Sequence, residues 1–205
     1  MKNSKALICI DIQNDFCPGG ALAVTEGDAI IAPVNQLIER ASAAGDMIVM
    51  TQDWHPANHA SFASQHDGLA PFSRITMPYG EQTLWPDHCV QGSSGAAFHD
   101  DLLLDSAHMI VRKGYRSMID SYSAFFENDR ITPTGLHGFL QEAGVSQLMM
   151  AGLATDYCVA FSALDAAHLG YEVTVIEHAC RAIDLDGSLA RQMSAMSQAG
   201  IQFAD

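Results

Sequence analysis

The sequence has few basic residues, no long apolar run and no paired cysteines. Only 10 lysines and arginines stand against 24 acidic residues, and the formal net charge is -14 at pH 7. Such a charge repels phosphate backbones and anionic membranes, so we expect neither nucleic acid nor a membrane as a partner. No apolar run approaches the ~18 residues that cross a bilayer. Asp11 interrupts the N-terminal run too early for a signal peptide.

The five cysteines are odd in number and include no C-x-x-C pair. Disulfide frameworks use even numbers of cysteines, so we expect reduced thiols and a cytoplasmic location. A length of 205 residues with 48% apolar residues suits a single domain spanning residues 1–205. Composition says nothing about oligomeric state, and a homo-oligomer stays open.

Short apolar runs alternate with helical patterns along the chain. The runs are almost continuously apolar, as in parallel strands that are covered on both faces. Three helical stretches end at Gly45, Gly144 and Gly170, and glycine commonly marks a helix end. The alternation predicts a doubly wound, three-layer α/β/α fold around a mainly parallel six-stranded sheet. The expected strands are 6–12, 46–52, 108–113, 146–153, 171–177 and 201–204, and the expected helices are 29–44, 134–143, 157–169 and 188–199.

Two regions break this alternation, 16–28 and 57–99. The second is rich in proline and glycine and contains the sequence WPDHCVQG. A loop system of this length inside a compact domain is usually functional. We expect residues from about 54 to 99 to form a long lid over the strand ends, not a second domain.

Reactive side chains follow four of the expected strands at the point where each ends. These are Asp11, Asp53, Lys113 and the turn ATDYC, which contains Cys158. Ligands of such sheets bind at the carboxyl ends of the strands. Cys158 falls in the first turn of a helix, which predicts a thiol pKa below the free value of about 8.5. If Asp11 and Lys113 meet this thiol, it can act as a nucleophile; the alternative is a buried cysteine that only packs.

Acidic and imidazole side chains also gather in the lid. Asp53 and His55 stand two residues apart, His59 follows, and His88 comes much later. Oxygen and imidazole ligands suit a divalent cation such as zinc, manganese or iron. Histidines that bind no metal are the alternative.

Three aromatic residues, Phe16, Trp85 and Tyr157, adjoin these motifs. Together they can hold a flat ring whose orientation is set by a few polar groups. Isolated aromatic residues of this kind more often belong to a core.

Six motifs in this order resemble those of the isochorismatase-like cysteine hydrolase superfamily. DxQNDF, RKG and TDYC mark the superfamily, and the pair DWH and WPxHC is typical of its nicotinamidases and pyrazinamidases. The resemblance covers nearly the whole chain. The motifs are IDIQNDFCPGGALAV, QDWHPANHASFASQH, WPDHCVQGSSGA, RKG, DSYSAFF and GLATDYCV.

The resemblance implies a role for each of these residues. It implies a cis peptide between Leu153 and Ala154, and one divalent metal ion, zinc first, with manganese or iron as alternatives. The implied residues are the catalytic triad Asp11, Lys113 and Cys158, the metal ligands Asp53, His55 and His88 with His59 as a further candidate, the oxyanion-hole amides of Ala154 and Cys158, and the ring contacts Phe16, Trp85 and Tyr157.

The implied activity is hydrolysis of nicotinamide to nicotinate and ammonia through a cysteine thioester, in NAD salvage. Pyrazinamide has the same ring-nitrogen and carboxamide geometry, so we expect it to be hydrolysed as well. Two alternatives stay open. One is another cysteine hydrolase of the superfamily that acts on a different amide or a ureido compound. The other is a non-catalytic module that binds a small molecule.

Overall fold

The computed structural model describes residues 5–205; the first four residues of the expected domain lie outside this range. Six parallel strands form one sheet in the order β5-β2-β1-β6-β7-β8. All six expected strands are confirmed. They are β1 (Lys5–Ile10), β2 (Met47–Asp53), β5 (Met109–Lys113), β6 (Gln147–Leu153), β7 (Glu172–Arg181) and β8 (Gln202–Ala204).

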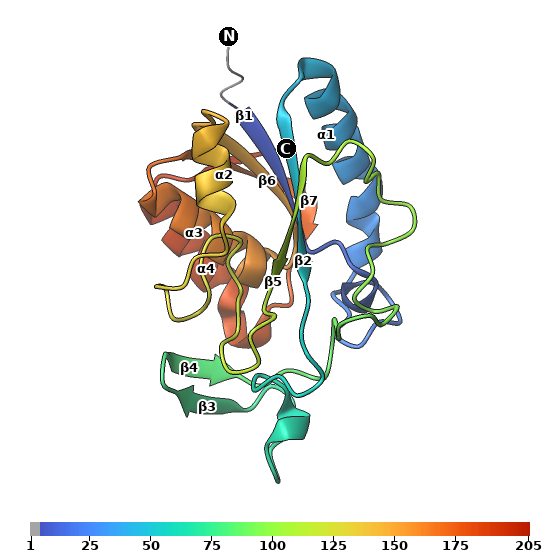
Figure 1. Ribbon diagram of the computed structural model, residues 1–205, viewed down its shortest axis with the longest axis vertical. Helices are drawn as coiled ribbons and strands as arrows, with labels where there is room; N and C mark the ends of the chain where they lie inside the picture. Colours follow the sequence, from blue (N-terminus) through green and yellow to red (C-terminus); the bar gives the residue numbers. More distant parts are fainter. Residues whose placement is uncertain (1–4) are drawn as a thin grey trace.

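Helices cover both faces of the sheet, which confirms the three-layer arrangement (Figure 1). Helix α1 (Ile31–Ala44) lies on one face, and α2 (Leu136–Glu142), α3 (Ala160–His168) and α4 (Ser188–Gln198) lie on the other. Helix α1 ends at Gly45, whose φ of 73° is a left-handed conformation that glycine adopts without a Cβ clash. Within residues 5–205, no helix is both long and apolar enough to cross a membrane.

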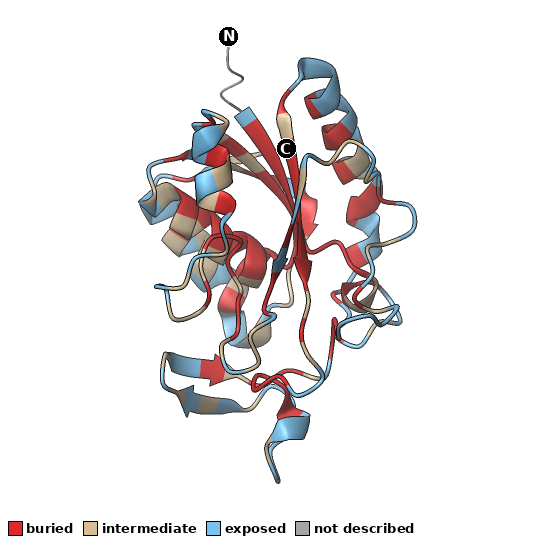
Figure 2. Ribbon diagram, in the orientation of Figure 1, coloured by how far each residue is buried: buried red, intermediate tan, exposed pale blue. Residues whose placement is uncertain are grey.

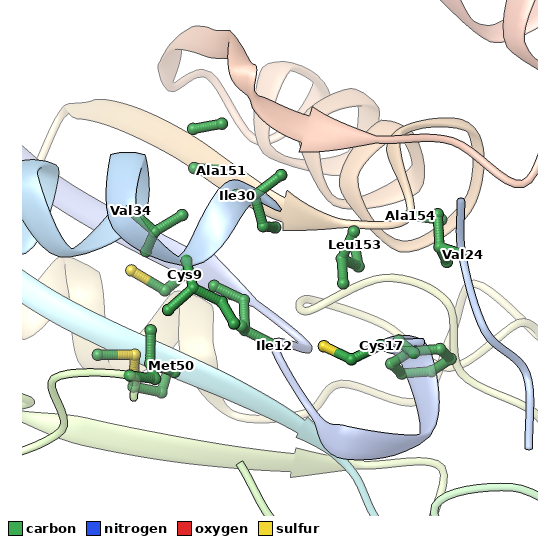
Figure 3. Close-up of a cluster of buried hydrophobic side chains, with 14 of the residues drawn as sticks. Cys9, Ile12, Cys17, Val24, Ile30, Val34, Met50, Ala151, Leu153 and Ala154 are labelled. Atoms are coloured by element: carbon green, nitrogen blue, oxygen red, sulfur yellow. The ribbon is translucent and has the colours of Figure 1, made fainter. Parts of the chain in front are cut away.

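The buried strands separate two apolar cores (Figure 2). Successive side chains of a strand point to opposite faces, so Leu7 and Cys9 of β1 join the core beside α1, whereas Ile8 and Ile10 join the core beside α2, α3 and α4. In the first core, side chains from α1, such as Val34, gather over the sheet (Figure 3). With both faces covered, the sheet holds its strand ends in fixed positions.

The segment expected as a lid also contains a hairpin that the sequence analysis did not predict. Strands β3 (Arg74–Met77) and β4 (Gly80–Thr83) pair in antiparallel fashion. The hairpin lies beyond the carboxyl ends of the central strands (Figure 1). Its strands are four residues each, too short for a reliable alternation of apolar and polar residues.

Candidate active site

Three of the reactive side chains meet above the carboxyl ends of the sheet. Asp11 follows β1, Lys113 ends β5, and Cys158 lies in a π-helical turn, Thr155–Val159, between β6 and α3. The Nζ atom of Lys113 lies 2.8 Å from Asp11 Oδ2 and 3.3 Å from Cys158 Sγ. Strands β5, β2, β1 and β6 are neighbours in the sheet, so their ends deliver the three groups to one point.

Thr51 holds the carboxyl group of Asp11 in place. Its Oγ1 donates a hydrogen bond to Asp11 Oδ1 at 2.6 Å and accepts one from the Asp11 backbone N–H at 3.1 Å. Asp11 has a φ of 48°, which is unusual for a residue other than glycine. This conformation and the bonds from Thr51 turn the carboxylate toward Lys113.

Burial changes the electrostatics that we expected for the thiol. It raises the pKa of Cys158 well above its usual value, and the Lys113 ammonium offsets only part of this effect. The expectation of a lowered pKa is therefore wrong. Desolvation destabilises the thiolate more than the N-terminal turn of the helix stabilises it. Burial also raises the pKa of Asp11 against the influence of Lys113. The resting site thus holds a neutral thiol beside a carboxylate of increased basicity.

Asp53, His55 and His88 form a second cluster beside this triad. They are buried, and their potential ligand atoms all lie within 4.8 Å of one another. His55 Nδ1 lies 2.8 Å from the Gly114 carbonyl oxygen, and His88 Nδ1 lies 2.8 Å from that of Pro86. Each Nδ1–H donates to its carbonyl, which leaves the Nε2 lone pair free for a metal. One carboxylate and two imidazoles fit a divalent cation of the zinc class.

The glycine of the RKG motif makes room for this cluster. Gly114 has a φ of 65°, and a Cβ atom built on it would lie 2.4 Å from His55 Cε1. Its carbonyl also accepts the His55 hydrogen bond. The motif therefore positions Lys113 and His55 at once.

His59 lies in a different group, with His55 and Asp120. Its Nδ1 lies 2.7 Å from Ser61 Oγ and accepts the Ser61 backbone N–H at 3.3 Å, while its Nε2 lies 3.3 Å from the Ile119 carbonyl. These bonds turn the His59 lone pair toward Ser61.

One cavity joins the thiol, the metal cluster and the three aromatic residues. Trp85 and Tyr157 meet edge to face with ring centroids 4.9 Å apart, and Trp85 Nε1 donates to the hydroxyl of Tyr122 at 3.2 Å. The peptide between Leu153 and Ala154 is cis. The cavity is lined by Phe16, Leu22, Asp53, His55, Trp85, His88, Asp120, Tyr122, Ala154, Tyr157, Cys158 and Ile183.

Sequence reasoning missed four of these lining residues: Leu22, Asp120, Tyr122 and Ile183. Asp120 and Tyr122 carried a signal, because they belong to the DSYSAFF motif that was used only for the resemblance. Leu22 and Ile183 carried none, since an isolated aliphatic residue has no chemical pattern.

Comparison with known proteins identifies the family of this site. Residues 5–205 match the model of the isochorismatase domain. The chain belongs to this family. A nicotinamidase of Acinetobacter baylyi is 52% identical over 200 residues, which cover 98% of this chain and 92% of that protein. A nicotinamidase of Escherichia coli is 46% identical over 197 residues, 96% of this chain and 92% of that protein.

Solved structures that are similar to this chain agree with this assignment. A nicotinamidase and pyrazinamidase from Acinetobacter baumanii has a TM-score of 0.95 and 48% identity, covering 99% of this chain and 96% of that one. PnC1 from L. infantum in complex with nicotinate has a TM-score of 0.84 and 35% identity, with 100% and 94% covered. A pyrazinamidase from Pyrococcus horikoshii in complex with zinc has a TM-score of 0.80 and 36% identity, with 98% and 99% covered.

Asp156 connects two segments of the cavity wall through hydrogen bonds. Its fully buried carboxylate accepts the backbone N–H groups of Ile183 at 3.0 Å and Asp184 at 2.8 Å, and also the hydroxyl of Ser188. These bonds tie the segment that carries Ile183 to the turn that carries Cys158. The aspartate of the TDYC motif therefore connects two walls of the cavity.

Proposed function

We propose that this chain is a nicotinamidase that hydrolyses nicotinamide to nicotinate and ammonia, feeds NAD salvage, and also hydrolyses pyrazinamide. The observation that carries the proposal is a cavity lined by Cys158 and by the cluster Asp53, His55 and His88. Asp11 and Lys113 are fully buried behind this lining, with the Lys113 ammonium in contact with both Asp11 and Cys158. The similarity to nicotinamidases over nearly the whole chain supports it.

Asp11 and Cys158 perform the covalent chemistry. Asp11 takes the proton of the Cys158 thiol as the sulfur attacks the carboxamide carbon, and a C–S bond forms. The C–N bond then breaks, and Asp11 passes its proton to the leaving nitrogen, which departs as ammonia. Water next attacks the thioester while Asp11 accepts its proton; the C–S bond breaks, nicotinate leaves, and the thiol recovers its proton.

Lys113 and two backbone amides stabilise the charge that develops during these steps. Burial disfavours the Lys113 ammonium, but the carboxylates of Asp11 and Asp53 raise its pKa well above the usual value, so it stays charged. The oxyanion is assigned to the N–H groups of Ala154 and Cys158, two residues that line the cavity. The ammonium group and the two N–H groups stabilise the transition state effectively because they are in place before the substrate binds.

Asp53, His55 and His88 would hold one divalent ion, zinc, with manganese or iron as the alternatives. When bound, the ion supplies a Lewis-acid position for the ring nitrogen of the substrate. Phe16, Trp85 and Tyr157 are assigned to the faces and edge of the ring. His59 is left out of the ligand set, because its ring nitrogens lie against Ser61 and Ile119.

Compartment and domain organisation complete the proposal. We place the protein in the cytoplasm, since all five cysteines are free and buried, as expected in a reducing environment. We also treat the chain as one domain, because the described residues share one central sheet.

Ammonia release from a panel of amides tests this function. Nicotinamide and pyrazinamide should be hydrolysed, and benzamide, which lacks the ring nitrogen, should react far more slowly. Cys158→Ala should lower the rate by a factor on the order of 10³ or more, because the nucleophile is lost. Faster release from a ureido compound would favour the other cysteine hydrolases, and unchanged activity of Cys158→Ala would refute the thioester mechanism.

A further inference from the structure

Asp120 is a buried acid of the cavity that has no part in the proposed chemistry. It is 2% exposed and lines the same cavity as Asp53, His55 and His88. One of its carboxylate oxygens lies within 4.8 Å of ring nitrogens of both His55 and His59. A second carboxylate therefore stands next to the metal cluster.

Two N–H donors hold the Asp120 carboxylate in place. The backbone of Ser121 donates to Oδ1 at 2.8 Å, and the side chain of Gln82 donates from Nε2 to Oδ2 at 2.7 Å. Both groups are N–H donors in these contacts, so they fix the orientation of the carboxylate oxygens.

Gln82 is itself rigidly placed. It is fully buried on β4, and its Oε1 accepts a hydrogen bond from the Tyr79 hydroxyl at 3.1 Å. Its Nε2 also donates to the Thr83 carbonyl oxygen at 2.7 Å, and it lies 3.0 Å from the Tyr122 hydroxyl. The hairpin thus reaches the cavity through one amide, and that amide orients Asp120.

The charges of the buried groups indicate what Asp120 does. Asp11, Asp53 and Asp120 are carboxylates, and Lys113 is the one ammonium among these four buried side chains. Counted at their formal charges, three carboxylates and one ammonium leave two negative charges, which one divalent cation balances when the imidazoles and the thiol are counted as neutral. A buried net charge is costly, so this balance favours an occupied metal site over an empty one.

We infer that Asp120, oriented by Gln82, is a positioning residue that raises the metal affinity of the site by supplying its balancing charge without serving as a ligand. The inference rests on the metal site of the proposed function. Mutation of groups just outside the ligands of a metal ion typically lowers metal affinity or activity by about 10–100-fold. A purely structural role of Asp120 would instead change folding and leave metal affinity unaltered.

Metal affinity measured without substrate tests the inference. Metal-free protein is titrated with zinc against a chromophoric chelator, for the wild type, Asp120→Asn and the control Asp67→Asn. Asp67 is an exposed acid of the same lid. The control therefore removes an equal charge from a side chain that is exposed to solvent. We expect Asp120→Asn to bind zinc about 10–100-fold more weakly and Asp67→Asn to bind like the wild type. Equal affinities for Asp120→Asn and wild type would overturn the inference.

A double variant separates charge from fold. In Asp120→Asn with Gln82→Glu, the carboxylate returns one hydrogen bond away, and the new amide can donate to it, so part of the lost affinity should be recovered. Failure of the double variant to exceed the single variant would count against a charge effect. If Asp120→Asn does not fold, Gln82→Met keeps the charge but frees the carboxylate, and should bind zinc more weakly than wild type; equal binding would overturn the inference. Absence of zinc binding by wild type would instead refute the metal site of the proposed function.

Discussion

Lys113 organises the candidate site through four contacts of one ammonium group, one of which is a hydrogen bond to the Ser121 carbonyl oxygen at 2.9 Å. It lies 2.8 Å from Asp11 Oδ2, 2.5 Å from Asp53 Oδ1 and 3.3 Å from Cys158 Sγ. The group is fully buried, so these contacts replace its hydration shell. One side chain thereby connects the metal cluster with the nucleophile. A change in the charge of Asp53 therefore alters the electrostatics of Cys158 through Lys113, and the reverse holds as well.

The raised pKa of Cys158 predicts how the thiol reacts with an alkylating agent. A thiolate forms only as the pH approaches the pKa, and burial raises that pKa well above 9.0. The rate of alkylation by iodoacetamide should therefore rise with pH and reach no plateau by about pH 9. Mass spectrometry of Cys158 across pH 6 to 10 measures it, and Cys158→Ala identifies the signal. A plateau near neutral pH would mean that the thiolate already exists at rest.

Among the connecting elements, the turn after β5 shows how little space the site leaves. Gly114→Ala would place a Cβ atom 2.4 Å from the imidazole of His55 and would strain a φ of 65°. We expect the variant to fold with strongly reduced zinc content and activity, which metal analysis and ammonia release measure. Gly138→Ala is the matched control: it lies in α2, where a Cβ atom meets nothing within 4 Å, and helix propensity favours alanine. Normal zinc content in Gly114→Ala would contradict the packing argument.

The hydrogen bonds of the Asp156 carboxylate predict that its removal lowers stability and weakens substrate binding. Asp156→Ala leaves the N–H groups of Ile183 and Asp184 without their acceptor. An unpaired buried donor costs about 1–3 kcal/mol, and 2 kcal/mol corresponds to a decrease in Tm of roughly 4–8 °C for a chain of this size. Thermal unfolding measures the stability, and an increased KM for nicotinamide reports the displaced Ile183. An unchanged Tm would show that water replaces the carboxylate at no cost.

Considered as a whole, the molecule brings its proposed metal ligands together from segments that are far apart in the sequence, and backbone hydrogen bonds such as His55 N–H to the Cys89 carbonyl at 3.0 Å join these segments beside the site. Asp53 ends β2, whereas His88 belongs to the lid. A ligand that binds only the folded state adds about 2.7 kcal/mol at a concentration of 100 times its Kd. Chelation should therefore lower the Tm by several degrees and abolish ammonia release, and added zinc should restore both. Cys158→Ala should show the same shift in Tm; a Tm that ignores the chelator would argue against the site.

The sequence by itself determined the alternation of strands and helices and the identity of the groups at the strand ends. Apolar runs and glycine stops are local patterns, and parallel strands align their carboxyl ends at one edge, so Asp11, Lys113 and Cys158 were expected at the same edge of the sheet. The strand order β5-β2-β1-β6, which only the structure shows, brings them into contact. The motifs of the family added the metal cluster. These inferences needed no knowledge of side-chain packing.

Only the tertiary structure decided the hairpin, the contacts of Asp120 and the pKa of Cys158. Gln82 reaches Asp120 across 38 positions of the chain, and no short-range pattern encodes such a pairing. The expectation for the thiol was wrong because a turn is local, whereas desolvation depends on everything that packs around the sulfur. Local periodicity specifies which side chains lie at the strand ends, whereas burial by distant segments determines their pKa values.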